Sequence, residues 1–291
     1  MWNLLYYIFC NFFIFIHIFQ WFRLFILWYI ENSYPIPVNN KYYGKIYIGN
    51  KLTQENKDKL KLEINKVAIE SVNCIPNYPI MRGEEMENKI FIVIYNYQHQ
   101  SVAMNCFFKW NSVKEVYHAG LFLVSNNHKG KGLQRYLTHF QKYIFLKEFP
   151  KFEVYVSDLG RSATGWKLLD SISEKCNPSL LNKNNDIEFL KLSKMIANDF
   201  YHKIAKKSCA VSYNSSYNKD TLCIKNCIEK EGGGFEELIY FEENRVSNDN
   251  RYNEKILELC PNKTDEFVII AKINIIYLIK MYFVSFFNFF F

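Results

Sequence analysis

Residues Val113–Leu137 read VKEVYHAGLFLVSNNHKGKGLQRYL, and this stretch decides the fold. Its first half, Val113–Ser125, is an apolar run that predicts a β-strand. After the glycines, apolar residues recur at the spacing of one helix face, at Leu133, Tyr136, Leu137, Phe140 and Ile144. The stretch therefore predicts a strand, a glycine turn and an amphipathic helix in direct succession.

The turn between the two elements, Asn127–Gly132, has the composition of an anion site. Glycines let the backbone turn tightly and approach a ligand closely. The unpaired N–H groups of the first helical turn and the helix dipole both favour a negative charge at that position. Lys129 and Lys131 add positive charge, so the turn suits a pyrophosphate. It is not a Walker P-loop, because the pattern G-x-x-x-x-G-K-[ST] is absent, and a dinucleotide fingerprint requires a parallel βαβ unit.

Upstream of the turn, the sequence predicts a strand, a helix and two further strands. Thr53 is suited to cap a helix over 54–72, because its side-chain oxygen can accept a hydrogen bond from a first-turn amide. Short polar turns separate the strand-like runs, as in an antiparallel meander. The strands are expected at Tyr47–Ile48, Ile90–Tyr95 and Ser101–Trp110.

Downstream of the turn, strands and helices alternate less regularly. The region 207–235 shows no clear pattern. Strands are expected near 152–156, 235–241 and 266–273, and helices at Ala163–Ile172 and near 187–206.

This order of elements resembles that of the GNAT N-acetyltransferases. Their signature, [RQ]-x-x-G-x-[GA], lies between the fourth strand and the next helix, and Gly130 and Gly132 fill its two glycine positions. The resemblance covers residues 45–175, with closing strands at 235–241 and 266–273. It implies an α/β (α+β) fold with a mixed, mainly antiparallel sheet flanked by helices. It also implies transfer of an acetyl group from acetyl-CoA to an amine on a small molecule or a protein.

The resemblance also implies which residues bind acetyl-CoA. Backbone groups at the end of the fourth strand would pair with the pantetheine amides, and the turn would hold the pyrophosphate. Ser162 would either contact the coenzyme or cap the following short helix. The implied cofactor-binding residues are Leu123, Val124, Asn127, His128, Lys129, Gly130, Lys131, Gly132, Leu133 and Ser162.

Candidate catalytic residues lie on the same strand. His118 and Glu115 occupy positions where some GNAT relatives place a base or a water relay, and histidine titrates near neutral pH. The alternatives are a structural His118 and a solvated Glu115. The sequence departs from the family pattern at Asn127, which replaces the usual Arg or Gln, and in the stretch Gly160–Leu169, which lacks the Tyr that protonates the leaving thiolate. A catalytically inactive CoA-binding module, or a membrane-surface interaction module of the same fold, is therefore the alternative function.

The two ends of the chain are strongly apolar. Residues 2–30 are long enough to span a bilayer. A cleaved signal peptide would begin with positively charged residues, but no Lys or Arg precedes Arg23. The sequence thus predicts an N-terminal transmembrane anchor. Downstream Lys41, Lys45 and Lys51 favour a cytosolic main domain. The stretch 267–291 is either a closing strand with a hydrophobic tail or a strand followed by a second span.

The composition of the chain argues against two further kinds of site, for nucleic acid and for metal. The net charge of +7 includes no long basic block, so no nucleic-acid partner is expected. The eight cysteines show no C-x-x-C spacing, which indicates reduced thiols and no metal site. The sequence does not indicate the oligomeric state. The expected segments are an anchor (1–31), a linker (32–44), the acetyltransferase core (45–175), an insertion (176–234), closing strands (235–273) and a tail (274–291).

Overall fold

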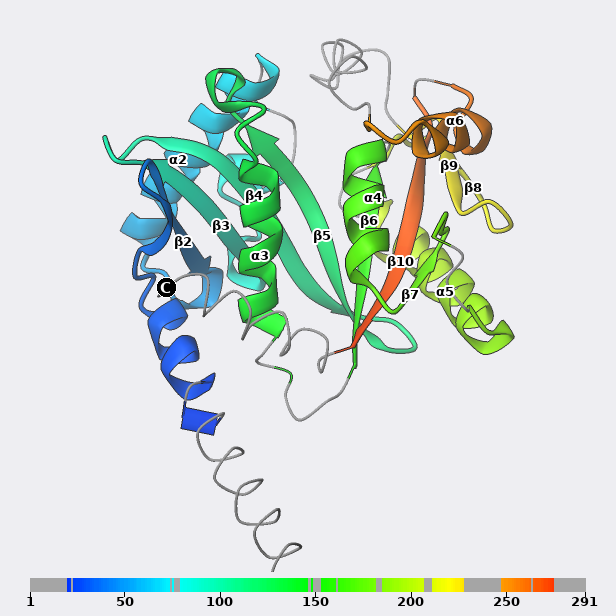
Figure 1. The fold of residues 1–291 in the computed structure, drawn as a ribbon, viewed down its shortest axis with the longest axis horizontal. Coiled ribbons are helices and arrows are strands. Elements are labelled where there is room, and N and C mark those ends of the chain that lie inside the picture. Colours follow the sequence, from blue (N-terminus) through cyan, green and yellow to red (C-terminus); the bar gives the residue numbers. More distant parts are fainter. Residues whose placement is uncertain are drawn as a thin grey trace, which may run out of the picture.

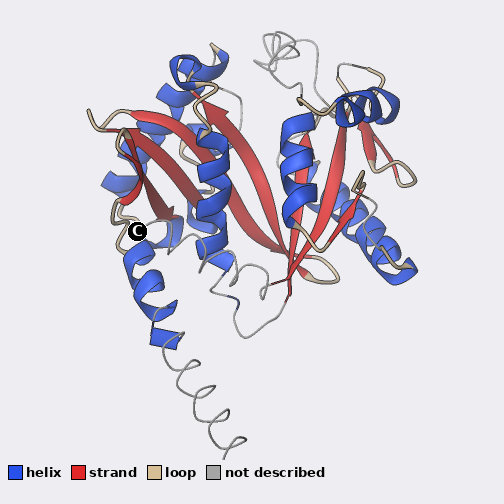
Figure 2. Ribbon diagram, in the orientation of Figure 1, coloured by secondary structure: helices blue, strands red, loops and turns tan. Residues whose placement is uncertain are grey.

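The computed structural model describes residues 20–21, 23–73, 75, 79–145, 148, 153–160, 162–181, 185–206, 211–227, 247–262 and 264–274. These residues form one mixed, mostly antiparallel sheet with helices on both faces (Figure 1 and Figure 2). Its strand order is β1-β2-β3-β4-β5-β6-β10-β9-β8, and β7 also pairs with β10.

The first half of the sheet is the predicted meander. Each of its strands pairs antiparallel with the next. The segment 32–44, expected to be a linker, instead contributes β1 and the first residues of β2. The strands are β1 (Ile36–Asn39), β2 (Tyr42–Ile48), β3 (Lys89–Asn96), β4 (Ser101–Asn111) and β5 (Glu115–Val124).

Helices cover the two faces of this sheet. α2 (Gln54–Val72) begins where the sequence predicts, because the Thr53 side chain accepts a hydrogen bond of 3.3 Å from the Asn56 amide. It packs on one face through buried Leu60 and Ile64. α3 (Leu133–Phe145) and α4 (Ala163–Ile172) pack on the opposite face.

The second half of the sheet is joined to the first by one parallel pair. β5 pairs parallel with β6, and β6 pairs antiparallel with β10, the closing strand expected near 266–273. The strand expected at 235–241 lies outside the described residues. The bounds are Glu153–Gly160 for β6, Glu266–Asn274 for β10, Lys175–Asn177 for β7, Ser216–Asn218 for β8 and Cys223–Lys225 for β9.

The helix expected near 187–206 is confirmed, as α5 (Ile187–Asp199) followed by a π-helical stretch (Phe200–Ala205). α5 packs on the face of the sheet opposite α4. A further helix, α6 (Asn250–Leu259), contacts α4 and is absent from the sequence prediction. The described part of the expected insertion, 176–234, belongs to the same sheet through β7, β8 and β9.

At the N-terminal end, the structure describes a helix that reaches Glu31. Its residue Ile30 is 2% exposed and joins the core beneath α3. Within the described ranges, no helix combines the length and apolarity that crossing a bilayer requires. Most of the expected anchor (1–31) and nearly all of the expected tail (274–291) lie outside those ranges.

Candidate functional site

β5 and β6 diverge beside the glycine turn. Their parallel pairing joins Val116–Ala119 to Tyr155–Asp158, and β5 then continues to Val124 without β6 as its neighbour. Figure 1 shows the two strands separating toward the ends from which α3 and α4 start. Beyond Ala119, the edge of β5 that faces β6 has no strand partner among the described residues. Such an edge can pair with the amides of an extended ligand.

A β-bulge bends β5 at the point where it diverges from β6. Asn105 of β4 pairs with Phe122, whereas Phe107 pairs with Ala119, so Gly120 and Leu121 together oppose one residue of β4. A Cβ on Gly120 would lie 2.7 Å from the Cys106 carbonyl oxygen, so the bulge requires glycine here. Because a bulge shifts the alternation of side chains, the residues after it change faces relative to those before it.

Buried side chains from β4 and α3 hold this bulge. Asn105 is fully buried, and its Nδ2 lies 3.4 Å from the Gly120 oxygen and 3.3 Å from the Leu121 oxygen. Gln141 of α3 donates from Nε2 to Asn105 Oδ1 at 2.8 Å. The sequence analysis missed both residues.

The turn itself presents its main chain to solvent. Gly130 and Gly132 have φ angles of 75° and 74°, and a Cβ on either would meet nothing within 4 Å. Glycine is therefore required here for backbone conformation, and open space surrounds the turn. No hydrogen-bond partner from the described chain reaches the amides of Gly130, Lys131, Gly132, Leu133 or Gln134.

Hydrogen bonds from the side chains of His128 and Lys131 stabilise the turn. His128 Nδ1 lies 2.9 Å from Tyr42 Oη on β2, and burial together with Lys131 lowers the pKa of this imidazole. Lys131 Nζ donates to the Asn127 carbonyl oxygen at 2.7 Å. Burial also lowers the pKa of the Lys129 ammonium group. The predicted turn residues thus come together, with open amides from Gly130 onward and the His128 ring hydrogen-bonded to Tyr42 of β2.

The end of β5 offers a second polar group. Ser125 is 1% exposed, and its hydroxyl has no hydrogen-bond partner in the part of the chain that the structure describes. A buried unpaired hydroxyl is costly unless something satisfies it. The open amides of the turn fit a polyanionic ligand, whereas the Ser125 hydroxyl lies buried directly before them.

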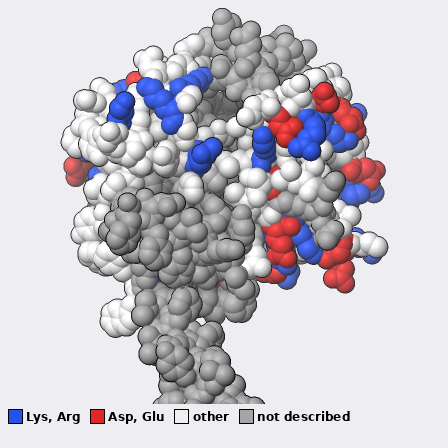
Figure 3. Space-filling model, viewed as in Figure 1, with Lys and Arg blue, Asp and Glu red and all other residues white. Residues whose placement is uncertain are grey.

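The N-termini of α3 and α4 lie next to each other. Ser162 caps α4, because its Oγ accepts a hydrogen bond of 3.1 Å from the Gly165 amide, which is the capping alternative of the sequence analysis. A Cβ on Gly165 would lie 4.0 Å from Gln134 Nε2 of α3. Two helix N-termini thus flank the divergence of β5 and β6, and both favour an anion. Figure 3 shows Lys and Arg side chains over the part of this face above α3, whereas most Asp and Glu lie over the half that carries α6, interspersed with further Lys and Arg.

The two predicted catalytic residues lie away from the turn. His118 is 7% exposed, its Nδ1 is 3.1 Å from Ser157 Oγ, and its ring stacks on Phe200 of the π-helical stretch at 4.4 Å. Burial, and secondarily Lys89, lowers the pKa of His118 to about 3. Glu115 is exposed at the opposite end of β5 and pairs with Lys109 at 3.0 Å. These surroundings favour the structural His118 and the solvated Glu115.

A carboxyl group that the sequence analysis missed lies at the point of divergence. Asp158 of β6 forms the last parallel pair, with Ala119. Its side chain shares the face of Val154 and Val156, on which α3 and α4 pack. Burial, with a contribution from Glu266, raises the pKa of this carboxyl to about 8, although the side chain keeps contact with solvent. The available signal was an acidic residue inside the apolar run EVYVSDLG.

A tyrosine does approach α4, from α6. Tyr252 is fully buried, its hydroxyl donates to Asp170 Oδ2 at 2.6 Å, and its ring packs edge-on against Trp166 of α4. Burial and the bond to Asp170 raise the pKa of Tyr252. This tyrosine joins α6 to α4 and does not replace the missing acid.

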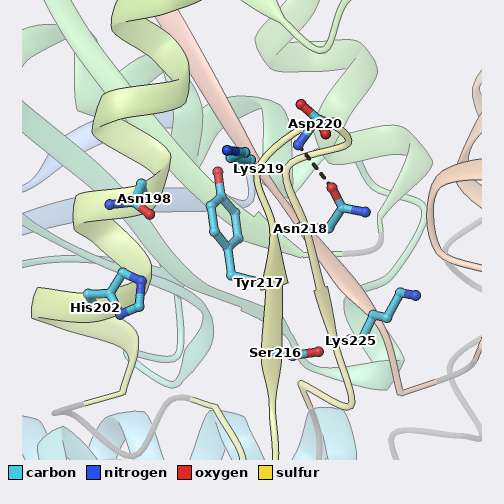
Figure 4. A pocket seen from close by; sticks show the side chains of 8 residues that line it. All are labelled: Asn198, His202, Ser216, Tyr217, Asn218, Lys219, Asp220 and Lys225. Carbon is cyan, nitrogen blue, oxygen red and sulfur yellow. Dashed lines mark hydrogen bonds between the residues drawn. The ribbon is translucent and has the colours of Figure 1, made fainter.

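A separate polar hollow of about 420 Å³ lies between α5 and the β8–β9 hairpin, at the far edge of the sheet (Figure 4). The Tyr217 hydroxyl there is buried without a partner within the described ranges. No sequence motif indicated this hollow. Its lining residues are Asn198, His202, Ser216, Tyr217, Asn218, Lys219, Asp220 and Lys225.

Comparison with known proteins gives matches among solved structures. No protein-family model matches the chain, and no curated protein sequence matches it. One similar structure is the glucosamine N-acetyltransferase region of a fungal multi-domain β-N-acetylglucosaminidase, with 12% identity, a TM-score of 0.30, and coverage of 42% of this chain and 14% of that one. Another is the GNAT family N-acetyltransferase YhbS from Escherichia coli in complex with CoA, with 12% identity, a TM-score of 0.29, and coverage of 43% and 66%.

A third similar structure is a variant of the spermidine N-acetyltransferase SpeG from Vibrio cholerae, with 13% identity, a TM-score of 0.28, and coverage of 41% and 70%. The chain thus spans less than two thirds of the first two of these proteins. The first two of these structures are described as GCN5-related or GNAT proteins, the family whose order of elements the sequence resembles, and the third as an N-acetyltransferase.

Proposed function

We propose that the protein is an N-acetyltransferase that binds acetyl-CoA between β5 and β6, with the pyrophosphate on the turn Asn127–Gly132. The observation that carries the proposal is the row of open amides from Gly130 to Gln134 beside the diverging strands. Main-chain amides at a helix N-terminus bind phosphate groups without a dedicated side chain. The replacement of the usual Arg or Gln by Asn127 is therefore compatible with binding.

The chain's own groups would bind each part of this substrate. The amides of the turn hold the pyrophosphate, and Lys129 adds positive charge beside it. The unpaired edge of β5, near Leu123 and Val124, bonds the amides of the pantetheine arm. Acetyl-CoA supplies the acetyl group as a thioester, whose carbonyl carbon an amine attacks. The acceptor is an amine on a small molecule or a protein.

We further propose that Asp158 is the acid of the reaction. As the amine nitrogen bonds to the carbonyl carbon, the carbon–sulfur bond breaks and the sulfur leaves as a thiolate. The protonated Asp158 carboxyl gives its proton to that thiolate, and the amine proton passes to a base. Support comes from the place of Asp158 at the divergence of β5 and β6, and from its pKa of about 8, which keeps it protonated at neutral pH. The role of His118 or Glu115 as base stays a prediction.

The binding step is tested by thermal unfolding of the full chain with and without CoA, since a ligand that binds only the folded state raises Tm. We expect CoA to raise Tm of the unaltered protein. Gly130→Trp should abolish the rise, and Lys129→Glu should reduce it. Gly83→Ala is the matched control, because Gly83 also has a positive φ, of 82°, but lies outside the turn. Equal stabilisation of all four proteins would remove the turn from the site.

The transfer step needs its own measurement. Acetylation is tested by measuring the release of free CoA from acetyl-CoA in the presence of a panel of amines. The panel includes spermidine and peptides with a free N-terminal amine. CoA binding without any transfer would identify the alternative, a CoA-binding module. We also propose that residues 1–31 hold the protein at a membrane with the main domain in the cytosol, as the apolar run and the following lysines suggest.

A further inference from the structure

The N-terminal helix carries two opposed apolar faces. Trp21, Leu24, Phe25 and Trp28 recur at the spacing of one helix face, and they are 74%, 54%, 56% and 53% exposed. At about 100° per residue, Ile26 and Ile30 fall on the opposite side of the same helix. Ile30 lies in the domain core, and Ile26 packs against it. One face is thus used by the protein, and the other is covered by nothing in the described chain.

The end of this helix is held to the segment that leads into β1. Tyr29 Oη donates to the Pro35 carbonyl oxygen at 2.7 Å, and Asn32 Nδ2 donates to the Trp28 oxygen at 2.8 Å. The ring of Tyr34, itself 39% exposed, lies 5.3 Å from that of Trp28 and 5.1 Å from that of Tyr29. The exposed stripe therefore continues past the helix as a set of packed aromatic rings, and the burial of Ile30 in the core turns this stripe away from the domain.

The chemistry of the stripe points to lipid as its occupant. Its five residues carry no charge, and its tryptophans and tyrosine are the residue types that concentrate at the membrane–water interface. The exposed Glu31 lies on the same side at the end of the helix, where it can reach water. Upstream, residues 2–19 also contain no Asp, Glu, Lys or Arg, so the apolar surface continues into an apolar chain. Because Ile30 cannot lie in the core and in lipid at once, any bilayer span must end before it.

We infer that Trp21, Leu24, Phe25, Trp28 and Tyr34 form a membrane-docking surface that seats in the interfacial layer of a bilayer and fixes the domain against it. The glycine turn and the N-termini of α3 and α4 lie at the end of the domain opposite this helix (Figure 1). The CoA site therefore opens away from the bilayer, where a water-soluble thioester can reach it. The inference rests on the proposed membrane attachment of residues 1–31 and does not require acetyl transfer.

Tryptophan quenching by brominated lipid tests this surface in the full chain. The five tryptophans include Trp110 and Trp166, which are 6% and 0% exposed and so lie out of reach of lipid. A variant with Trp2→Phe and Trp21→Phe leaves Trp28 as the lipid-facing reporter. In phosphatidylcholine vesicles brominated near the headgroups, we expect loss of most of the Trp28 emission. Adding Trp28→Phe should leave only unquenched emission.

A matched control comes from an exposed apolar residue elsewhere on the domain. Leu257 of α6 is 61% exposed, and Leu257→Trp in the background without Trp2, Trp21 and Trp28 should stay unquenched. Quenching at residue 257 equal to that of Trp28 would overturn the inference, because it would indicate unspecific adsorption. An unquenched Trp28 would also overturn it. If the protein were then dimeric by light scattering, the surface would belong to a second copy. Acetyl-transfer assays are read separately, so failure of the enzyme proposal would not alter these results.

Discussion

Gln141 of α3 donates a hydrogen bond of 2.8 Å to the side-chain oxygen of Asn105 on β4, and both side chains are buried. Asn105 in turn faces the carbonyl oxygens of the β5 bulge. A helix that begins at the glycine turn is thus linked to the point where β5 leaves β6. Stability and CoA binding are therefore expected to depend on the same pair.

Gln141→Leu should lower the free energy of unfolding by about 1–3 kcal/mol, because it leaves the buried Asn105 oxygen without its donor. It should also weaken CoA binding, since the bulge is then less well fixed. Urea unfolding and calorimetric titration with CoA measure the two effects. Gln98→Leu, in the exposed turn between β3 and β4, is the control and should change stability by no more than about 0.5 kcal/mol. Unchanged CoA affinity in Gln141→Leu would contradict the link.

Asp158→Asn should slow turnover by about two orders of magnitude, the size of a general-acid contribution, with little change in KM for acetyl-CoA. In the unaltered enzyme, kcat should fall as pH rises through about 8, where the carboxyl loses its proton. Glu266→Gln removes a repulsive charge and should move this alkaline limb to lower pH. If Glu266→Gln did not shift the alkaline limb of the pH–rate profile, Asp158 would not be the group that titrates there.

The same carboxyl makes stability depend on pH. Its pKa is raised from the ordinary value of 3.8 to about 8 in the folded state, so the folded protein binds the extra proton between these values. The free energy of unfolding should therefore be highest below the unfolded pKa and decline as pH rises toward 8. Asp158→Asn should flatten this decline in urea titrations. A slope that persists unchanged in the variant would show that other groups cause it.

His118 should act on stability with the opposite sign. Its pKa is lowered from 6.5 to about 3, so below pH 6.5 the unfolded chain binds a proton that the folded protein does not. Stability from this site is present above pH 6.5 and lost as pH falls toward 3. His118→Phe should reduce the difference in unfolding free energy between neutral and mildly acidic buffer, and the exposed His202→Asn should leave it unchanged. If His118 were instead an accessible catalytic base, the turnover rate would fall as pH drops below the ordinary histidine pKa of 6.5. His118→Phe would then abolish activity.

Tyr252→Phe should cost about 1–3 kcal/mol of stability and leave the turnover rate nearly unchanged. The ring still packs on Trp166, while Asp170 loses one of its donors and retains Ser179 Oγ and the Leu180 amide, at 2.7 and 3.0 Å. Chemical unfolding and steady-state kinetics separate the two quantities. A large loss of turnover in a variant that keeps its structure would make Tyr252 the acid and remove Asp158 from that role.

Local signals were sufficient to predict the elements around the turn. α2 begins after Thr53 because a capping side chain and a helical apolar stripe agree, and the glycine turn follows a long apolar strand. β7, β8 and β9 have three residues each, too few for a period to appear. α6 buries only Tyr252 and Ile256, so its apolar stripe is narrow.

The sequence predicted only the part of the site whose residues are contiguous in the chain. The turn is contiguous, so its composition was enough. The bulge is held by Asn105 and Gln141, which lie 36 positions apart, and Asp158 becomes notable only through its register with Ala119. The covering of His118 by Phe200 likewise depends on where α5 packs. Single-sequence patterns do not carry such long-range pairings.

The burial of Ile30 means that the segment proposed as a membrane anchor and the folded domain share residues. A chain shortened at the expected boundary, after Glu31, would lose Ile26 and Ile30 together and leave an open hole in the core beside α3. Cleavage at that boundary would therefore destabilise the domain as well as remove the proposed membrane anchor. Soluble versions for crystallisation should therefore begin upstream of Arg23, with the outward aromatic stripe replaced by polar residues instead of deleted.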